Sequence, residues 1–298
     1  MSDSETKAVR NRLALGTAQF GMNYGVANRS GQVPIDEVTR ILALARDHRI
    51  DTLDTAMDYG DSEACIGESG SAGFKVITKL SAVPEHVSDV EGWVRSKVEA
   101  SLQRLRAASV YGLLLHRPHQ LPGPGGKELA RALQRLKAEG LVEKIGVSIY
   151  APTELDSVLQ ACPLDLVQAP FSLIDQRLHT SGWLDKLHGA GVEVHVRSAF
   201  LQGLLLMPRA SIPDKFKPWV PVWDAWHEWL QQHGSSAVNA CIGFVQTFPQ
   251  VERIVVGVDS LAQFSQLIAA SNVALQADWP SISVEDEVLI NPANWNGL

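Results

Sequence analysis

Six polar side chains stand at the carboxyl ends of six successive apolar segments of this sequence. They are Asp54, Lys79, His116, Ser148, Gln168 and Arg197. If the segments are parallel strands of one barrel, their carboxyl ends all meet at one face, and these side chains converge although they are far apart in the chain. Convergent polar groups at that face are the expected setting for catalysis.

A carboxylate, an ammonium, an imidazole and a phenol can together transfer a proton at a carbonyl. A tyrosine with its ordinary pKa of ~10 gives its proton readily to an alkoxide but regains it slowly near neutrality. We expect Lys79 to lower the pKa of Tyr59 and Asp54 to hold Lys79 in place. His116 would donate a hydrogen bond to the carbonyl oxygen and orient it.

Each of these four residues also has a simpler interpretation when it is taken alone. Asp54 could cap the following turn, and Lys79 could be an exposed lysine at the rim of the barrel. His116 could hydrogen-bond a loop carbonyl, and Tyr59 could pack within its own loop. Three of the four end predicted strands, and Tyr59 follows the strand that ends at Asp54. Their joint occurrence favours a catalytic site.

Short apolar runs alternate with amphipathic stretches through most of the chain. The predicted strands are Leu13–Ala18, Ile50–Asp54, Phe74–Lys79, Tyr111–His116, Lys144–Ser148, Leu164–Gln168, Val192–Arg197 and Arg253–Gly257. The predicted helices are 35–48, 62–68, 88–106, 127–139, 152–160, 179–190, 235–247 and 260–270. Continuous apolar strands joined by helices are typical of parallel pairing, and eight such units favour a closed (β/α)8 TIM barrel, an α/β fold. We expect one domain over residues 1–298, and no GxGxxG motif follows the first strand to indicate a Rossmann fold.

The composition excludes several classes of protein. A net charge of −7 and a pI near 5.7 argue against general binding to nucleic acid or to an anionic membrane. Three distant cysteines indicate reduced thiols of a cytoplasmic protein, with neither a disulfide framework nor a metal site. The polar start MSDSETKAVRNR does not resemble a signal peptide, and no apolar run approaches the ~20 residues of a membrane span. We therefore expect a cytoplasmic protein that acts on a small molecule.

The connection between the seventh and eighth predicted strands is enlarged to about sixty residues. It contains MPRASIPDKFKPW and PVWDAWHEWLQQ, and it emerges at the face where barrel active sites lie. Trp223, Trp226 and Trp229 recur at helical spacing. They either pack an additional helix onto the barrel or contribute to a substrate pocket.

The sequence resembles the aldo-keto reductase family from LALGTAQFG to the eighth strand and its helix. LDTAMDYGDSEACIG is similar to the family signature, VITKL and LLLHRP to the segments with its lysine and histidine, and FLQGLL to a later segment. The signature match contributes Asp54 and Tyr59 and continues through Ser62, Glu63 and Gly67. The resemblance implies an NAD(P)-dependent oxidoreductase that acts on an aldehyde, ketone or sugar. Its catalytic residues would be Asp54, Lys79, His116 and the proton donor Tyr59.

The same resemblance implies a set of cofactor contacts. GVS at 146–148 and LVQAPFSLID at 166–175 are similar to the segments that hold the nicotinamide, so Ser148 and Gln168 would bind its carboxamide. The implied cofactor-binding residues are Gly16, Thr17, Ala18, Asp54, Ser148, Gln168, Arg197, Leu201, Gly203, Gly257, Val258, Asp259, Ser260 and Gln263.

Two positions near the nicotinamide depart from the family pattern. Ile149 stands where an asparagine is frequent, which removes one carboxamide contact. Arg197 stands where an aromatic residue commonly stacks under the nicotinamide. A guanidinium there could stack on a ring, bind an anionic substrate or pair with a carboxylate at the rim.

A third departure follows the eighth strand. Many NADPH-using relatives have Lys or Arg just after the glycine, where the 2′-phosphate lies, but this chain has Gly257-Val258-Asp259-Ser260. Asp259 would repel a phosphate and accept hydrogen bonds from ribose hydroxyls, which favours NAD over NADP. Asp259 or Ser260 could equally cap the eighth helix, whose free N–H groups could hold a pyrophosphate. The missing positive charge could come from the long loop, from Arg209, Lys215 or Lys217.

Other functions explain fewer of these residues. A Schiff base on Lys79 leaves Tyr59 without a role, and the segment Gly67-Glu68-Ser69-Gly70 is followed by Ser71, so no G-x-S-x-G hydrolase motif is complete. Two alternatives keep the cofactor: a redox-neutral epimerase or lyase that retains NAD(P), and a cofactor-sensing binding subunit.

Overall fold

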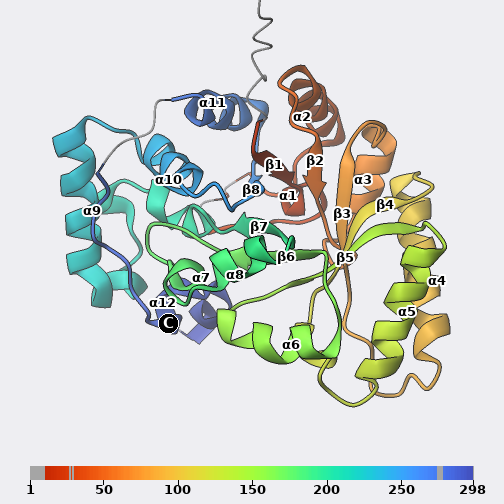
Figure 1. Ribbon diagram of the computed structural model, residues 1–298. Helices are drawn as coiled ribbons and strands as arrows, with labels where there is room; N and C mark the ends of the chain where they lie inside the picture. The colour runs from red at the N-terminus through yellow and green to blue at the C-terminus, as the bar shows by residue number, and fades with distance from the viewer. Residues whose placement is uncertain (1–10, 27, 29, 274–277, 298) are drawn as a thin grey trace, which may run out of the picture.

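Eight parallel strands close into a barrel in chain order, which confirms the predicted (β/α)8 fold. The computed structural model describes the whole chain except residues 1–10, 27, 29, 274–277 and 298 (Figure 1). The strands are β1 (Leu13–Gly16), β2 (Thr52–Asp54), β3 (Lys75–Leu80), β4 (Val110–Leu115), β5 (Val142–Ser148), β6 (Leu166–Pro170), β7 (Glu193–Arg197) and β8 (Arg253–Gly257). Each strand pairs with the next, and β8 pairs with β1.

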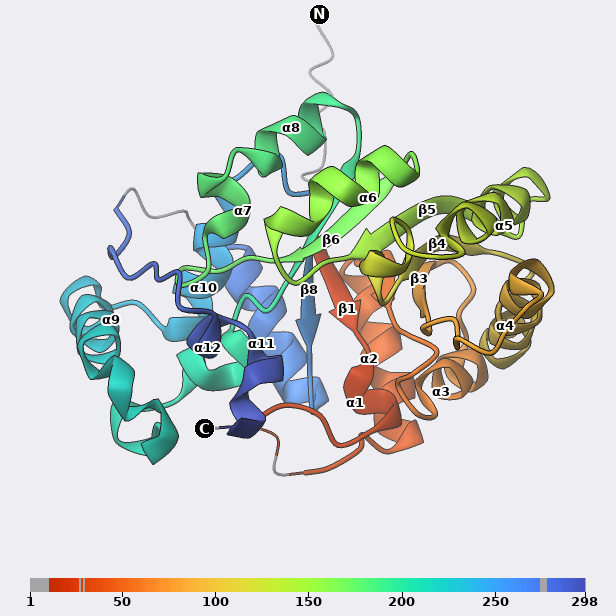
Figure 2. The ribbon, with the colours of Figure 1, turned by 90° about the horizontal axis from the view of Figure 1, so that it is seen from below.

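Helices surround the strands in both views of the ribbon (Figures 1 and 2). The α-helices are α1 (Ala18–Gly21), α2 (Ile35–Asp47), α3 (Ser62–Ser69), α4 (Val90–Leu105), α5 (Gly126–Ala138), α6 (Leu155–Ala161), α7 (Arg177–Thr180), α8 (Trp183–Gly189), α9 (Val220–His233), α10 (Ala237–Gln246), α11 (Leu261–Ser271) and α12 (Glu287–Ile290). The 3-10 helices are η1 (Pro118–Gln120), η2 (Pro152–Glu154), η3 (Leu201–Leu206), η4 (Arg209–Ser211), η5 (Asp214–Trp219) and η6 (Pro292–Gly297).

Several predicted boundaries were wrong. The helix predicted over 179–190 is two helices, α7 and α8, because Gly182 between them is in the left-handed region with φ 77°. The first strand ends at Gly16, since α1 already begins at Ala18. β3 and β6 continue past Lys79 and Gln168, so these side chains lie just before the strand ends. Side chains alternate along a strand, and the inward direction of both residues is unaffected.

The additional helix α9 carries the three tryptophans of its stripe into the core. Trp223 and Trp226 are fully buried and Trp229 is nearly so. The indole N–H groups of Trp223 and Trp226 donate to the carbonyls of Phe216 and Leu205, at 2.9 and 3.0 Å. α9 lies at the edge of the molecule opposite α4 and α5 (Figures 1 and 2). The prediction that this stripe packs an additional helix is confirmed.

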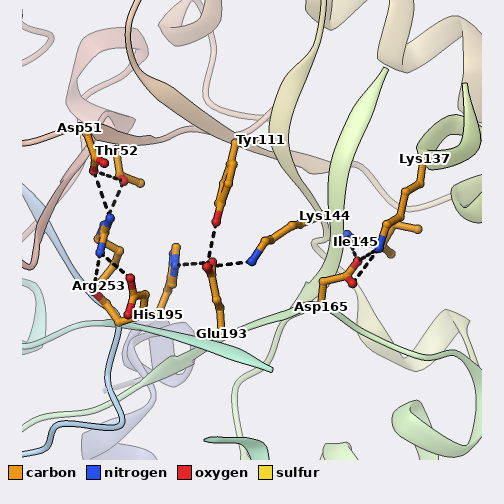
Figure 3. A network of polar contacts seen from close by, with 11 residues as sticks. Asp51, Thr52, Tyr111, Lys137, Lys144, Ile145, Asp165, Glu193, His195 and Arg253 are labelled. Carbon is orange, nitrogen blue, oxygen red and sulfur yellow. Dashed lines mark hydrogen bonds and ion pairs between the residues drawn. The ribbon is translucent and has the colours of Figure 1, made fainter. Parts of the chain in front are cut away.

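The amino-terminal end of the barrel is filled by charged side chains (Figure 3). Glu193 of β7 accepts from the Tyr111 hydroxyl of β4 at 2.8 Å and pairs with Lys144 of β5 at 2.7 Å. Arg253 of β8 is 2% exposed and pairs with Asp51, beside β2, at 3.1 Å. These contacts connect strands that are not neighbours in the barrel, at the end away from the predicted site.

The described residues include no helix long and apolar enough to cross a membrane. Cys65, Cys162 and Cys241 are free thiols, as the cysteine spacing predicts.

The closeness of β5 to its neighbours gives a stability prediction. A Cβ at Gly146 would lie 2.1 Å from the backbone oxygen of Leu166 and 2.6 Å from a methyl of Leu114. We expect Gly146→Ala to lower the free energy of unfolding by about 1–3 kcal/mol or more, because overpacking forces the strands apart. The matched control is Gly189→Ala, because a Cβ at Gly189 meets no described atom within 4 Å. Urea denaturation of both variants checks this, and equal stability of Gly146→Ala and the unmodified protein would contradict it.

Candidate active site

A buried ion pair lies at the centre of the carboxyl-terminal face. Lys79 Nζ lies 2.7 Å from Asp54 Oδ2 and donates to the carbonyl of Thr55 at 2.8 Å. The two charged side chains are only 1% and 7% exposed. Burial lowers the pKa of Lys79, and Asp54 opposes that effect. Lys79 is therefore not an exposed rim lysine, and Asp54 holds it as expected.

Tyr59 lies against this pair in the loop after β2. Lys79 Nζ stands 5.1 Å from the centroid of the Tyr59 ring. Burial raises the pKa of Tyr59, and the carboxylate of Asp54 raises it further. The expected lowering of this pKa is not met, because Asp54 neutralises the Lys79 charge and the ammonium lies over the ring. Tyr59 consequently keeps its proton through the neutral range.

His116 follows β4 directly, and its ring stands edge-on to Tyr59 with the centroids 6.0 Å apart. Its Nδ1 faces Asp58 Oδ2 at 3.4 Å, so its partner is a carboxylate and not a loop carbonyl. Burial and the charge of Lys79 lower the pKa of His116, although Asp58 raises it. The imidazole is therefore neutral at neutral pH.

Asp54 also connects the ion pair to the predicted carboxamide site. Gln168 Nε2 donates to Asp54 Oδ1 at 2.7 Å, and Ser148 Oγ donates to Gln168 Oε1 at 3.1 Å. All three side chains are buried. Strand register explains the contact, because Ser148 and Gln168 are paired residues of β5 and β6.

A cavity of about 410 Å³ opens from this cluster toward α11. Predicted site residues that line it are Gly16, Thr17, Ala18, Asp54, Tyr59, Arg197, Gly203, Gly257, Asp259 and Gln263. Predicted site residues that do not line it are Lys79, His116, Ser148, Gln168, Leu201, Val258 and Ser260. Lining residues that the sequence analysis missed include Gln19, Tyr24, Asn28, Ser198, Gln202 and Gln266.

Tyr24 is the most informative of the missed residues. Its hydroxyl accepts from Gln202 Nε2 at 3.2 Å, which connects the loop after β1 to the loop after β7. Tyr24 is 39% exposed, but desolvation of its phenol raises the pKa of the group, and the neighbouring Tyr59 adds to that effect. The available signal in the sequence was an aromatic residue beside Gly25, shortly after the LGTAQFG motif.

The loop after β7 is strained where it lines the cavity. Ser198, Leu201 and Gln202 have positive φ angles of 63°, 47° and 51°. Non-glycine residues rarely adopt this conformation, and such strain gathers at functional sites. The Leu201 side chain is buried and anchors the loop. Gln202 and Gly203 then line the cavity.

Arg197 places a positive charge in the same cavity. Its guanidinium lies 4.8 Å from the centroid of the Tyr150 ring and donates to the carbonyl of Ile149 at 3.0 Å. Within the described part of the chain no carboxylate forms an ion pair with Arg197. The predicted alternative of a rim ion pair is wrong, because an aromatic face and a backbone carbonyl hold this side chain.

The start of α11 is capped by protein groups. Ser260 Oγ accepts from the N–H of Gln263, and Gln263 Oε1 accepts from the N–H of Asp259. Glu37 of α2 accepts from the N–H of Leu261 at 2.7 Å. The cap prediction is confirmed for Ser260 and wrong for Asp259. The N–H groups of Leu261 and Gln263, expected to be free for a pyrophosphate, are already bonded.

Asp259 lines the cavity beside this cap. One of its carboxylate oxygens is buried and has no hydrogen-bond partner among the described residues, and burial raises the pKa of the group. The three cations of the long loop are engaged elsewhere. Arg209 pairs with Asp224, Lys217 pairs with Asp214, and Lys215 donates to the carbonyl of Trp295. Arg197 is the only cation among the described residues that line the cavity.

The remaining signature residues support the site from behind. Glu63 is 1% exposed and accepts from Thr78 and Ser101 at 2.6 Å, and it pairs with Arg104 at 2.6 Å. A Cβ at Gly67 would lie 2.1 Å from the backbone oxygen of Arg104. This part of the motif packs α3 against α4 and β3, so its role is structural.

Comparison with known proteins agrees with this geometry. The family model described as "Aldo/keto reductase family" matches residues 12–282. The chain is 28% identical over 195 residues to 6-dehydroglucose reductase of Agrobacterium fabrum, covering 59% of this chain and 64% of the relative. It is 29% identical over 224 residues to NADH-specific methylglyoxal reductase of Escherichia coli, covering 67% of each. The chain thus spans somewhat under two thirds of the length of the first of these relatives.

Solved structures show the same architecture. The glycerol dehydrogenase AKR11B4 from Gluconobacter oxydans matches with a TM-score of 0.68 and 25% identity, covering 89% of this chain and 88% of that chain. The holo aldo-keto reductase AKR11C1 from Bacillus halodurans matches in fold, with a TM-score of 0.71 and 18% identity over 89% of this chain and 88% of that chain. Because the family model matches residues 12–282 and the strands close into a (β/α)8 barrel, this chain belongs to the aldo/keto reductase family.

Proposed function

We propose that this chain is an NAD(P)-dependent oxidoreductase that passes hydride between nicotinamide and an aldehyde, ketone or sugar, with Tyr59 as the proton donor. The observation that carries the proposal is the buried Lys79–Asp54 pair against Tyr59, with His116 beside the phenol. Tyr59 and Asp54 also line the cavity in which a substrate would meet them. The relatives are named as reductases and dehydrogenases, which supports this class of reaction.

The cavity walls fit a dinucleotide. Gly16 and Gly257 have no side chains, so their backbone atoms line the cavity directly. A Cβ at Gly257 would lie 2.8 Å from the Gln19 side chain. Nicotinamide, when bound, supplies or accepts the hydride, and the protein has to position it. Ser148 and Gln168 do not line this cavity but are bonded to each other and to Asp54, which does. Gln168 keeps a second amide hydrogen and Ser148 keeps free oxygen lone pairs, with which we propose that they hold the carboxamide.

The side chains of the site can then supply the proton that carbonyl reduction requires. Tyr59 holds its proton at neutral pH and can give it to the alkoxide that forms at the carbonyl oxygen. The resulting phenolate lies near Lys79 and Arg197, and the Arg197 charge favours that ionised form. Asp54 keeps the ammonium oriented throughout.

Charges at the start of α11 support NAD over NADP. Asp259 places a carboxylate in the cavity wall at this helix start, and a 2′-phosphate there would meet like charge. Glu37 adds a second carboxylate at the same helix start, although it also pairs with Arg40 at 2.6 Å. Arg197, the one cation among the described residues that line the cavity, is held beside Tyr150. The relative from Escherichia coli is named as NADH-specific, which agrees with this preference.

Tyr59→Phe tests the proton donor. We expect a loss of ~10²–10⁴-fold in kcat for carbonyl reduction, because positioned acid catalysis is removed. NADH affinity should be nearly unchanged. The measurement is turnover of a panel of aldehydes, ketones and sugars, with NADH binding followed by nucleotide fluorescence.

The matched control is Tyr24→Phe, which removes a phenol oxygen from the same cavity. It should keep turnover within a few-fold. Full turnover of Tyr59→Phe would show that the assignment of Asp54, Tyr59, Lys79 and His116 as catalytic residues is wrong. Tight cofactor binding by the unmodified protein without net turnover would instead support a redox-neutral enzyme or a cofactor-sensing subunit.

Cofactor preference gives a second prediction. Two like charges roughly 4 Å apart repel by ~1 kcal/mol in water and ~4 kcal/mol at an effective dielectric of 20. NADH should therefore bind at least several-fold more tightly than NADPH at low salt. Asp259→Arg should narrow or invert that preference without a change in the chemical step. Dissociation constants for both nucleotides check this.

Glu37→Gln refines the same test, because glutamine can still accept from the N–H of Leu261 while the charge is removed. Asp36→Asn is the matched control, since Asp36 and Glu37 both pair with Arg40 but Asp36 is far more exposed. Glu37→Gln should improve NADPH binding more than Asp36→Asn does. Equal or better NADPH binding by the unmodified protein would overturn the preference.

A further inference from the structure

Asp58 precedes Tyr59 in the loop after β2, and proton transfer from Tyr59 does not require its carboxylate. Its Oδ2 lies 3.4 Å from Nδ1 of His116. Its other oxygen, Oδ1, accepts from the Ser81 hydroxyl at 2.5 Å. Asp58 therefore connects the loops that follow β2, β3 and β4, and Ser81 fixes the direction of its carboxylate.

The contact determines which imidazole nitrogen carries the proton. A neutral imidazole has one N–H donor and one acceptor nitrogen, and a partner at one nitrogen sets the state of the other. An ionised carboxylate only accepts hydrogen bonds, so Nδ1 of His116 has to be the donor toward Asp58. Nε2 of the neutral ring is then an acceptor.

That state of Nε2 matters for a carbonyl substrate. A carbonyl oxygen can only accept a hydrogen bond, so it needs an N–H from His116. With the Nδ1 proton held by Asp58, Nε2 carries a proton only in the doubly protonated imidazolium. The hydroxyl of an alcohol substrate, in contrast, can donate to the unprotonated Nε2.

The charged groups that face His116 determine the pH at which its imidazolium forms. Lys79 from β3 and Arg117 next to His116 carry positive charge, while Asp58 carries negative charge. Tyr59 meets the ring edge-on and keeps its proton. Burial and Lys79 lower the pKa of His116, so the imidazolium forms below the ordinary histidine range.

We propose that Asp58 is a positioning residue that holds the proton of His116 on Nδ1, so that Nε2 donates to a carbonyl only in the imidazolium and accepts from an alcohol otherwise. The inference rests on the proposed function, because it assigns a consequence to His116 in carbonyl chemistry. Reduction is then favoured as the pH falls through the pKa of His116, and alcohol oxidation is favoured above it.

The direct test is the tautomer of His116 in the full chain without substrate. Protein with ¹⁵N-labelled histidine is examined by long-range ¹H–¹⁵N correlation spectra at neutral pH. The signal of His116 is identified by its absence from the spectrum of His116→Gln. The unmodified protein should show the proton on Nδ1. Asp58→Ala should move it wholly or partly to Nε2, and Ser81→Ala should do so in part.

The matched control is Asp61→Ala in the same loop, because the Asp61 side chain does not cap α3. It should leave the His116 spectrum unchanged. A proton on Nε2 in the unmodified protein, or an identical tautomer in Asp58→Ala, would overturn the proposal. Circular dichroism confirms folding, and Asp58 is half exposed, so its truncation leaves no cavity.

The pH profile provides the second measurement, with NADH and methylglyoxal as the probe. An oriented donor is worth about 10²–10³-fold, so kcat/KM of the unmodified protein should rise at least ~10-fold from about pH 8.5 to about pH 4.5. Asp58→Ala should flatten this change to within ~3-fold, since either tautomer is then available. An equal rise in kcat/KM toward low pH in the unmodified protein and in Asp58→Ala would contradict the role of Asp58. If methylglyoxal is not reduced at any pH, the proposed function is at fault, whereas the spectra still decide the tautomer.

Discussion

The arrangement of the site depends on one buried charge, the ammonium of Lys79. A charge that is 1% exposed is tolerated only when paired and hydrogen-bonded, and Asp54 and the carbonyl of Thr55 provide those contacts. Because Asp54 uses one oxygen for Lys79, its other oxygen is free to accept from Gln168, which in turn accepts from Ser148. The ion pair thus fixes side chains from four different strands in one connected cluster.

The barrel separates this cluster from a second group of charges. At the amino-terminal end, Glu193 and Arg253 connect strands across the barrel (Figure 3). At the carboxyl-terminal end, Asp54 pairs with Lys79 and Asp58 faces His116, while Arg197 lies in the cavity wall without a carboxylate partner among the described residues. The charge of Arg197 suits a site in which the phenol of Tyr59 becomes negative.

The sequence was sufficient to predict the fold, and it named four residues that the structure brings together: Asp54, Tyr59, Lys79 and His116. Strand periodicity placed Asp54, Ser148 and Arg197 at the ends of β2, β5 and β7, and barrel closure then brought them to one face. Such residues can be predicted because a strand end is a local property of the chain.

Contacts between segments that are far apart in the chain could not be predicted from the sequence. Glu37 reaches the start of α11 across 224 positions, and Tyr24 meets Gln202 across 178. Neither pair has a local signal, because the approach depends on how the barrel closes. The pKa of Tyr59 was predicted in the wrong direction for a similar reason. Residue types alone do not show that Asp54 takes up the charge of Lys79, nor how deeply the phenol is buried.

The central claim is that Lys79 and Asp54 act as one buried unit, and a double-mutant cycle on stability tests it most directly. Urea denaturation of Lys79→Met, Asp54→Asn and the double variant gives the three free energies of unfolding. Each single change should cost about 3–5 kcal/mol, because it leaves a buried charge without its partner. The double variant should cost less than the sum of the two by at least ~2 kcal/mol. Additive costs would contradict the account, since they would mean that the two side chains do not depend on each other.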